Sequence, residues 1–263
     1  MIITVLGSGS KANSIIIQHR DNAIMIDAGF DLDVMLSNLE SANIATSSIQ
    51  ALFITHGHSD HTMGITAFNK HASIPVYMAE NLFNSSIGRN NPSFGACLNL
   101  EKNQAVLFNE WDNIFIGDFE VMPIPVSHDY VSSVGFIIKA GKEKLSIVTD
   151  TGGLCQESKD AMKDSNIIML ESNHDPEMLQ KSNRPYFLKK RISGATGHLS
   201  NEKSAEILSE IISSITRDVV LLHLSGECNT HELARNAAFD KNPVLKEGSV
   251  NLHITSQNDI CRI

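Results

Sequence analysis

The chain has 263 residues, of which 42% are hydrophobic and 19% are charged, and its formal net charge is −9. This composition is typical of a soluble globular protein, and the negative charge argues against a protein that grips nucleic acid with its whole surface. The apolar runs are far shorter than the roughly 18 residues of a membrane span, and the N-terminus shows neither the basic flank nor the cleavage site of an export signal. We therefore expect a cytoplasmic protein.

Short apolar runs separated by turns predict alternating strands and helices along the chain. Strands are expected at residues 1–6, 14–19, 23–27, 49–55, 74–78, 119–124, 134–139, 145–149, 167–171, 219–223 and 249–255. Helices are expected at residues 32–39, 61–71, 202–212 and 230–239. Because no linker, repeat or charge block divides the chain, residues 1–263 are expected to form one domain, with two sheets packed together and helices outside.

The cysteine pattern bears on redox chemistry. Cys97, Cys155, Cys228 and Cys261 are widely scattered and show no paired metal or redox spacing. We expect them to be free thiols in a reducing compartment.

The strongest local pattern is a histidine cluster at the end of the strand predicted over residues 49–55. His56, His58, Asp60 and His61 place four potential metal ligands within six residues. In extended backbone His56 and His58 point to the same side, while Asp60 and His61 lie where the chain turns and reach a second ion. Imidazole and carboxylate ligands together suit zinc, manganese or iron. The alternative is a surface loop that is merely rich in histidine, which the preceding buried strand disfavours.

Two coordination spheres need more ligands than this motif holds. His128, Asp150 and His223 each follow or end a predicted strand, so the edge of a sheet would bring them together. Asp150 is the natural bridge, because a carboxylate can lend one oxygen to each of two ions. Taken singly, each of the three residues fits a structural role as well as it fits the role of a metal ligand. Their combination favours a dinuclear site.

The order His-x-His-x-Asp-His, then His, Asp and His, resembles that of metallo-β-lactamase-fold hydrolases over essentially the full length. The resemblance implies a four-layer αββα sandwich, an α/β fold of two mixed β-sheets flanked by helices, with the metals at one edge. It implies one ion held by His56, His58 and His128, a second held by Asp60, His61 and His223, and Asp150 as the bridge.

Other segments distinguish branches of this superfamily. A β-lactamase would place a cysteine at the second metal site, where Asp150 stands, and a flavodiiron-type redox member would have an acidic residue in place of His58. Segments 170–175 and 197–201 resemble the Glu and Gly-His-Ser segments of tRNA 3′-processing endonucleases. Together with segments 6–14 and 223–229 they are most similar to the YycJ/WalJ branch, which implies a 5′-to-3′ DNA exonuclease. Lys11 and Ala12 depart from the Ser-Gly expected in the first of these motifs.

One histidine outside the ligand pattern is a candidate for proton transfer. His198 follows Gly197 and precedes a predicted helix, so it is free to carry a proton, and Glu171 would orient it and stabilise its charged form. The alternative is a histidine that caps the next helix. We predict Asp60, His198 and Glu171 as catalytic residues. We interpret His174 as a structural or surface residue, and an auxiliary residue of the site is the alternative.

Substrate contacts are predicted from one basic stretch and one loop. Residues 184–191 are the concentrated basic segment of an acidic chain, and Lys189, Lys190 and Arg191 lie close to two aromatic residues. This combination predicts contact with phosphates and stacking on a base of DNA, whereas a solvated helix face is the alternative. Ser8 is predicted to bind an anion through the backbone N–H groups of its loop.

The expected mechanism uses two divalent ions, which are zinc, manganese or iron. The two ions share a water molecule and lower its pKa toward ~7. A metal-bridging hydroxide would attack phosphorus, and His198 would protonate the departing oxygen. A cyclic-nucleotide phosphodiesterase is an alternative that would not need residues 189–191, and a glyoxalase II-like thioester or lactone hydrolase would not need the Glu171–His198 pair. Seven ligands disfavour a non-enzymatic module, because structural zinc sites close around one ion with four ligands.

Overall fold

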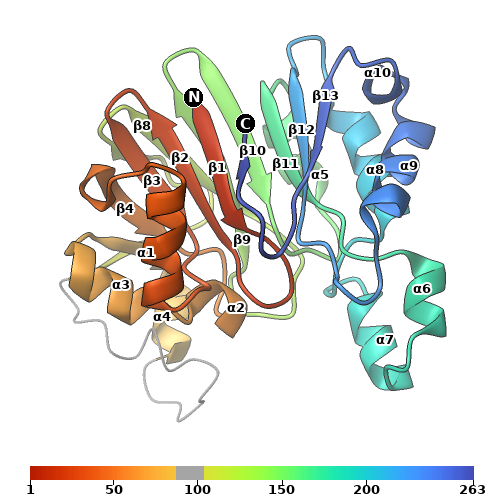
Figure 1. Cartoon of the computed structure of the whole chain (residues 1–263), viewed down its shortest axis with the longest axis horizontal. Coiled ribbons are helices and arrows are strands. Elements are labelled where there is room, and N and C mark those ends of the chain that lie inside the picture. Colours follow the sequence, from red (N-terminus) through yellow and green to blue (C-terminus); the bar gives the residue numbers. More distant parts are fainter. Residues whose placement is uncertain (87–103) are drawn as a thin grey trace.

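The computed structural model of the chain describes residues 1–86 and 104–263. Its strands form two seven-stranded sheets that face each other, with helices outside both (Figure 1). Cys97 lies outside the described residues, whereas Cys155, Cys228 and Cys261 are free thiols as expected. Within the described ranges, no helix has both the length and the apolarity needed to cross a membrane.

The first sheet joins the first part of the chain to its last residues. Its strands are Ile2–Gly7 (β1), Ser14–His19 (β2), Asn22–Ile26 (β3), Ile49–Phe53 (β4), Val76–Ala79 (β5), Ala105–Phe108 (β6) and Cys261–Arg262 (β14). They lie in the order β14-β1-β2-β3-β4-β5-β6. β1, β2 and β3 pair antiparallel, whereas β3, β4, β5 and β6 are parallel, so the carboxyl ends of β3 and β4 lie at the same edge.

The second sheet contains the remaining strands. They are Ile114–Ile116 (β7), Phe119–Pro125 (β8), Val134–Ala140 (β9), Glu143–Val148 (β10), Ile167–Glu171 (β11), Asp218–Leu222 (β12) and Asn251–Ile254 (β13). Their order is β13-β12-β11-β10-β9-β8-β7. β7 to β10 pair antiparallel, and β10 to β13 are parallel, which places the carboxyl ends of β10, β11 and β12 side by side.

The space between the two sheets is an apolar core. Phe53 from β4 and Phe136 from β9 meet edge to face, with ring centroids 5.6 Å apart. Side chains of β11 alternate, since Ile167 and Met169 belong to this core while Ile168 packs in a second apolar cluster under the outer helices. All of β11 is buried, as expected for a strand covered on both faces.

Helices complete the two outer layers (Figure 1). The helices outside the first sheet are Leu32–Ser41 (α1), Ile65–Ala72 (α3) and Glu80–Ser86 (α4). The helices outside the second sheet are Gln156–Met162 (α5), Asn201–Ile211 (α8), His231–Lys241 (α9) and Pro243–Lys246 (α10). A 3₁₀ turn at Thr46–Ser48 precedes β4, and the short helix Ser59–Thr62 (α2) follows it. Two further helices, Pro176–Lys181 (α6) and Tyr186–Ile192 (α7), project at one end of the second sheet. The predicted four-layer αββα sandwich is confirmed.

The described chain departs from the predicted elements in a few places. The helix predicted over residues 61–71 is two helices, α2 and α3, because Gly64 donates its N–H to Ala28 O at 2.8 Å rather than to a helical partner. Gly64 also lies so close to the preceding loop that a Cβ atom on it would be 2.1 Å from Phe30 O. The sequence patterns predict no element at β14, α4, α5, α6 or α10, which have 2, 7, 7, 6 and 4 residues. For α7 a helix is only the alternative interpretation of the basic stretch.

A second close approach, at Gly29, holds the loop that carries Asp60. A Cβ atom on Gly29 would lie 1.8 Å from Asp60 O and 2.6 Å from Asn13 N, so Gly29→Ala must displace backbone. We expect this variant to lower the free energy of unfolding by about 1–3 kcal/mol, measured by denaturant titration. Gly226→Ala is the matched control, because nothing lies within 4 Å of its added Cβ. Equal stability of the two variants would contradict this packing.

Candidate metal centre

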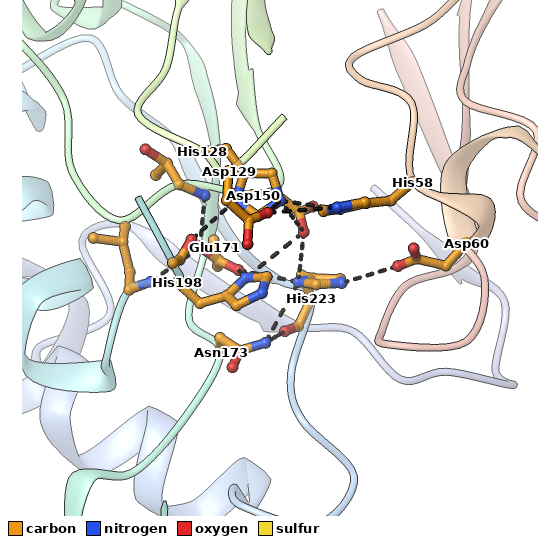
Figure 2. Close-up of polar contacts among 12 residues, drawn as sticks. His58, Asp60, His128, Asp129, Asp150, Glu171, Asn173, His198 and His223 are labelled. Carbon is orange, nitrogen blue, oxygen red and sulfur yellow. Dashed lines mark hydrogen bonds and ion pairs between the residues drawn. The ribbon is translucent and has the colours of Figure 1, made fainter. Parts of the chain in front are cut away.

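The seven predicted ligands follow strands of both sheets at one end of the sandwich. Figure 2 shows five of them together: His58, Asp60, His128, Asp150 and His223. His56 and His58 follow β4, Asp60 and His61 lie on α2, His128 follows β8, Asp150 follows β10 and His223 follows β12. The structure thus brings into one cluster residues from the first quarter to the last part of the chain.

Three histidine nitrogens converge in one part of this cluster. His56 Nε2 lies 3.1 Å from His58 Nδ1, and His128 Nε2 lies 3.2 Å from the same atom. Burial and the neighbouring His128 lower the pKa of His58 to about 4, so its ring is neutral at pH 7. Ring nitrogens arranged in this way are a ready ligand set for one cation, since neutral imidazole is the form that binds metals.

A second set surrounds Asp60. Its Oδ2 lies 3.4 Å from His61 Nε2 and 3.6 Å from His223 Nε2. Burial opposes ionisation of Asp60, but the neighbouring His61 and His223 together hold the pKa of the carboxyl well below its usual range. An ionised carboxylate with two imidazoles is a donor set that zinc or manganese accepts.

Asp150 lies between the two sets (Figure 2). Its Oδ2 is 3.2 Å from His61 Nε2, and its Oδ1 is 3.9 Å from His128 Nε2. The side chain is only 3% exposed. The two oxygens of one buried carboxylate therefore face histidines of both sets, which is the placement expected of a bridging ligand.

The chemistry of these donors fits divalent cations. Asp150 Oδ2 and His223 Nε2 are buried and have no hydrogen-bond partner among the described residues. Buried polar atoms without partners are costly, and a coordinated ion would satisfy both of them. Ligand atoms lie within 4.8 Å of one another in the sets His56–His58–His128, Asp60–His61–His223 and His56–His61–Asp150. These sets contain the same seven residues that the sequence pattern predicts.

Four of the five histidines are held through their second ring nitrogen. The partners of Nδ1 are Thr55 Oγ1 for His56, Asp27 Oδ2 for His61, Gly197 O for His128 and Glu171 Oε1 for His223, at 3.0, 2.6, 3.0 and 3.0 Å. Such contacts fix the orientation of each ring and direct its other nitrogen toward the cluster, where a metal would bind. The cluster is therefore preorganised by the protein around it.

Asp27 and Asn13 are residues of this centre that the sequence patterns missed. Asp27 is 1% exposed, and it accepts hydrogen bonds from Thr55 N–H at 2.9 Å and Thr55 Oγ1 at 2.8 Å. Burial raises the pKa of Asp27, and the contact with His61 opposes the rise. Asn13 Nδ2 lies 3.0 Å from His61 Nε2. An aspartate at the end of a strand adjacent to the histidine strand is the signal that would have identified Asp27.

Glu171 and His198 form the contact expected of them. His198 Nδ1 lies 2.7 Å from Glu171 Oε1, and Glu171 also accepts hydrogen bonds from the N–H groups of Thr151 and Leu199 at 2.9 and 3.0 Å. Burial opposes the charged form of His198, but Glu171 outweighs it and raises the pKa of the ring. The ligand atoms of Glu171 and His198 also group with those of Asp150 and His223, so the pair adjoins the metal cluster directly.

A cavity of about 300 Å³ opens onto the cluster. Besides Asp60, Asp150, His198 and His223, its walls include two arginines, Arg184 before α7 and Arg191 on α7. Arg191 pairs with the carboxylate of Asp129, whose Oδ1 lies 3.4 Å from His58 Nε2, and Arg184 lies 3.0 Å from Glu227 Oε2. Both guanidinium groups are thus fixed on the side of the cavity that α7 forms.

The structure divides the residues predicted to bind substrate. Arg191 lines the cavity, but Lys189 and Lys190 line a separate hollow on the other side of α7, because a helix directs neighbouring residues to different faces. Ser8 is buried, and its polar groups are used internally. Its N–H donates to Ser256 O at 3.0 Å, and its hydroxyl accepts from His223 N–H at 2.9 Å and donates to Asn13 Oδ1 at 3.1 Å. Ser10, in the same loop, lines the cavity instead.

Comparison with known proteins agrees with this geometry. A family model described as "Beta-lactamase superfamily domain" matches residues 22–224. The chain belongs to this superfamily. It is 31% identical to the exodeoxyribonuclease YycJ of Bacillus anthracis over 235 residues, 88% of this chain and 85% of that protein. It is 29% identical to the exodeoxyribonuclease WalJ of Streptococcus pneumoniae over 231 residues, 88% of this chain and 84% of that protein.

A solved structure shares the superfamily fold over the full chain. The metallo-β-lactamase fold protein YhfI of Bacillus subtilis matches with a TM-score of 0.70 and 16% identity, covering 100% of this chain and 99% of that chain. The predicted membership of the superfamily, with likeness to the YycJ/WalJ branch, is confirmed. The chain is a metal-dependent hydrolase of this superfamily.

A substitution at Asp27 tests how the surrounding residues support the candidate metal centre. Asp27→Asn keeps the size of the side chain but replaces one of its two acceptor oxygens with a donor, so it cannot satisfy both Thr55 and His61. We expect metal affinity to fall about 10- to 100-fold in competition with a chromophoric chelator. Asp33→Asn, at an exposed position of α1, is the control. Wild-type affinity in the Asp27 variant would show that this contact does not support the site.

Proposed function

We propose that this chain is a dinuclear metal-dependent phosphodiesterase that degrades DNA as a 5′-to-3′ exonuclease. One arrangement carries the proposal: the Glu171–His198 pair adjoins the ligand cluster, and Arg184 and Arg191 lie in the walls of the same cavity. A proton donor and fixed cations beside a metal centre suit the cleavage of a phosphodiester. The names of the two bacterial relatives support DNA as substrate and exonuclease activity. We further propose that residues 1–263 act as one domain in the cytoplasm.

The metal ligands would divide between two ions. His56, His58 and His128 would hold one divalent ion, Asp60, His61 and His223 the other, with Asp150 shared between them. Zinc suits the histidine set, while the carboxylates of the second set are also compatible with manganese or iron. When bound, two such ions lower the pKa of water and neutralise charge that develops on phosphoryl oxygens.

His198 is the residue placed to supply a proton. Its Nδ1 is engaged by Glu171 at 2.7 Å, which orients the ring and stabilises its charged form. The ring lines the cavity, so its second nitrogen is available to a substrate there. In this role His198 donates a proton to the oxygen that leaves phosphorus, while Glu171 keeps the ring in position.

Arg184 and Arg191 would orient the substrate. Each is already paired with a carboxylate, Glu227 and Asp129 respectively, so little side-chain freedom is lost when an anion binds. Guanidinium groups recognise phosphate oxygens through paired hydrogen bonds. Two of them in one cavity favour a chain with several phosphates. A cyclic nucleotide has a single phosphate, and a thioester or lactone need have none, so the two alternative hydrolase functions leave one or both arginines without a phosphate to bind.

A substrate panel tests the proposed function directly. We expect the metal-loaded protein to degrade 5′-phosphorylated DNA and to hydrolyse a simple phosphodiester, with slower cleavage of a cyclic nucleotide and of a thioester. Metal analysis of the same sample should give two ions per chain, as expected if the seven ligands divide between two sites. Cleavage of the thioester with intact DNA would refute the nuclease proposal.

The role of His198 can be separated from metal binding. His198→Asn should retain the metal content of the wild type and slow DNA cleavage by roughly 10²–10⁴-fold, the range of general acid catalysis. With a substrate that has a better leaving group, the variant should lose less of its cleavage rate, because that leaving group needs no protonation. His71→Asn, at an exposed position of α3, is the matched control. An equal loss for both leaving groups would argue that His198 supports the site without donating a proton.

A further inference from the structure

A hollow lies on the other side of α7 from the catalytic cavity. Its volume is about 480 Å³, and its walls come from α6, α7, Ser193 and His174. Tyr186, Lys189 and Lys190 are the α7 side chains among them. The volume falls in the range of sites that bind small organic molecules.

The charge of this hollow is opposite to that of the chain as a whole. Its lining contains two lysines and no carboxylate among the described residues, although the chain carries a formal net charge of −9. Lys189 Nζ donates a hydrogen bond to Gln180 O at 2.6 Å, which ties α7 to α6. Lys190 Nζ lies 5.7 Å from the centroid of the Tyr186 ring. A concave surface with this charge concentrates anions.

One exposed aromatic side chain stands at this site. Tyr186 is 74% exposed, whereas its neighbour Phe187, exposed to the same extent, is not among the described residues that line the hollow. The ring of Tyr186 lines the hollow with Lys190 beside it, so an aromatic face and a cation are presented together. Exposed aromatic rings next to lysines are the combination on which single-stranded nucleic acids stack their bases while their phosphates contact the cations.

His174 adds a polar group to the wall. It is 2% exposed, and its Nδ1 has no hydrogen-bond partner among the described residues. Burial lowers the pKa of His174 to about 4, so the ring is neutral at pH 7 and has one donor and one acceptor nitrogen. His174 also lines a small cavity shared with Ser10, Arg184 and His198, which lies between the hollow and the catalytic centre.

We propose that this hollow is a second nucleotide-binding site, which holds an unpaired base and a phosphate of the strand whose phosphodiester lies in the catalytic cavity. The inference rests on the proposed nuclease function. Leu188, Arg191 and Ile192 line one cavity, and Tyr186 and Lys190 line the other, so α7 is their common wall. One helix with its side chains is about 10–12 Å thick, a distance that a single strand spans within a few nucleotides.

Binding to an uncleavable strand tests the site. The probe is a short fluorescein-labelled single strand with phosphorothioate linkages, titrated into the metal-loaded protein and followed by anisotropy. We expect Tyr186→Ala to raise Kd about fivefold or more, as loss of one base stack predicts. We expect Lys190→Gln to reduce the slope of log K against log salt by about 0.7, as loss of one phosphate contact on a single strand predicts. Lys246→Gln, on α10, is the control with the same charge change.

Hydrolysis of bis(p-nitrophenyl) phosphate by the same proteins separates the two proposals, because this diester is too small to reach across α7. A selective effect of Tyr186→Ala and Lys190→Gln on strand binding supports the second site. Wild-type Kd and salt slope in both variants would overturn the second site. Cleavage of the diester and of DNA would still support the proposed function in that case. If the wild type cleaves neither DNA nor the diester, the proposed function fails, and strand binding alone decides whether the hollow is a nucleotide site.

Discussion

Buried negative charge governs the structure around the metal centre. Asp27, Asp150 and Glu171 are each no more than 4% exposed, and ionised carboxylates at that depth are stable only with donors or compensating charge. Glu171 is satisfied by two backbone N–H groups and two histidine rings, and Asp27 by Thr55 and His61. Asp150 keeps an oxygen without a hydrogen bond among the described residues. The first two carboxylates can therefore position histidines, whereas Asp150 is left to bind cations.

Backbone contacts couple His198, the proposed proton donor, to α7, the helix that we propose to contact the substrate. His198 N–H donates to Ile192 O, at the end of α7, at 2.7 Å, and Gly197 O lies 3.0 Å from Nδ1 of the metal ligand His128. A Cβ atom on Gly197 would lie 2.1 Å from Arg191 O, so only glycine allows this loop to lie against α7. The position of α7 is therefore linked to the position of His198 relative to the ligand cluster, so the proposed substrate contacts and the proposed proton donor would move together.

The ligand cluster could be predicted because its evidence is local. The segment from His56 to His61 has a distinctive spacing, and His128, Asp150 and His223 each follow a strand that an apolar run identifies. The buried strands were predictable for the same reason. Asp27 is different, since its role depends on a neighbouring strand and on a ring 34 residues away, and no periodicity reports such a contact. Short helices such as α6 and α7 likewise lack enough turns for an apolar stripe to repeat.

The basic run before His198 shows why a substrate surface is harder to predict than a metal site. Three successive cations at residues 189–191 look like one patch in the sequence, but a helix turns them to different sides, so that Arg191 faces the catalytic cavity while Lys189 and Lys190 face away from it. The net charge of −9 argues against binding of nucleic acid by the whole protein surface, but it does not report where individual cations lie. Because electrostatic attraction between exposed charges decays within about 10 Å at 0.1 M salt, the cations on the two sides of α7 act on a bound strand largely independently of the distant acidic surface. The distribution of charge around this helix, rather than its sum over the chain, therefore determines whether an acidic protein can hold a polyanion.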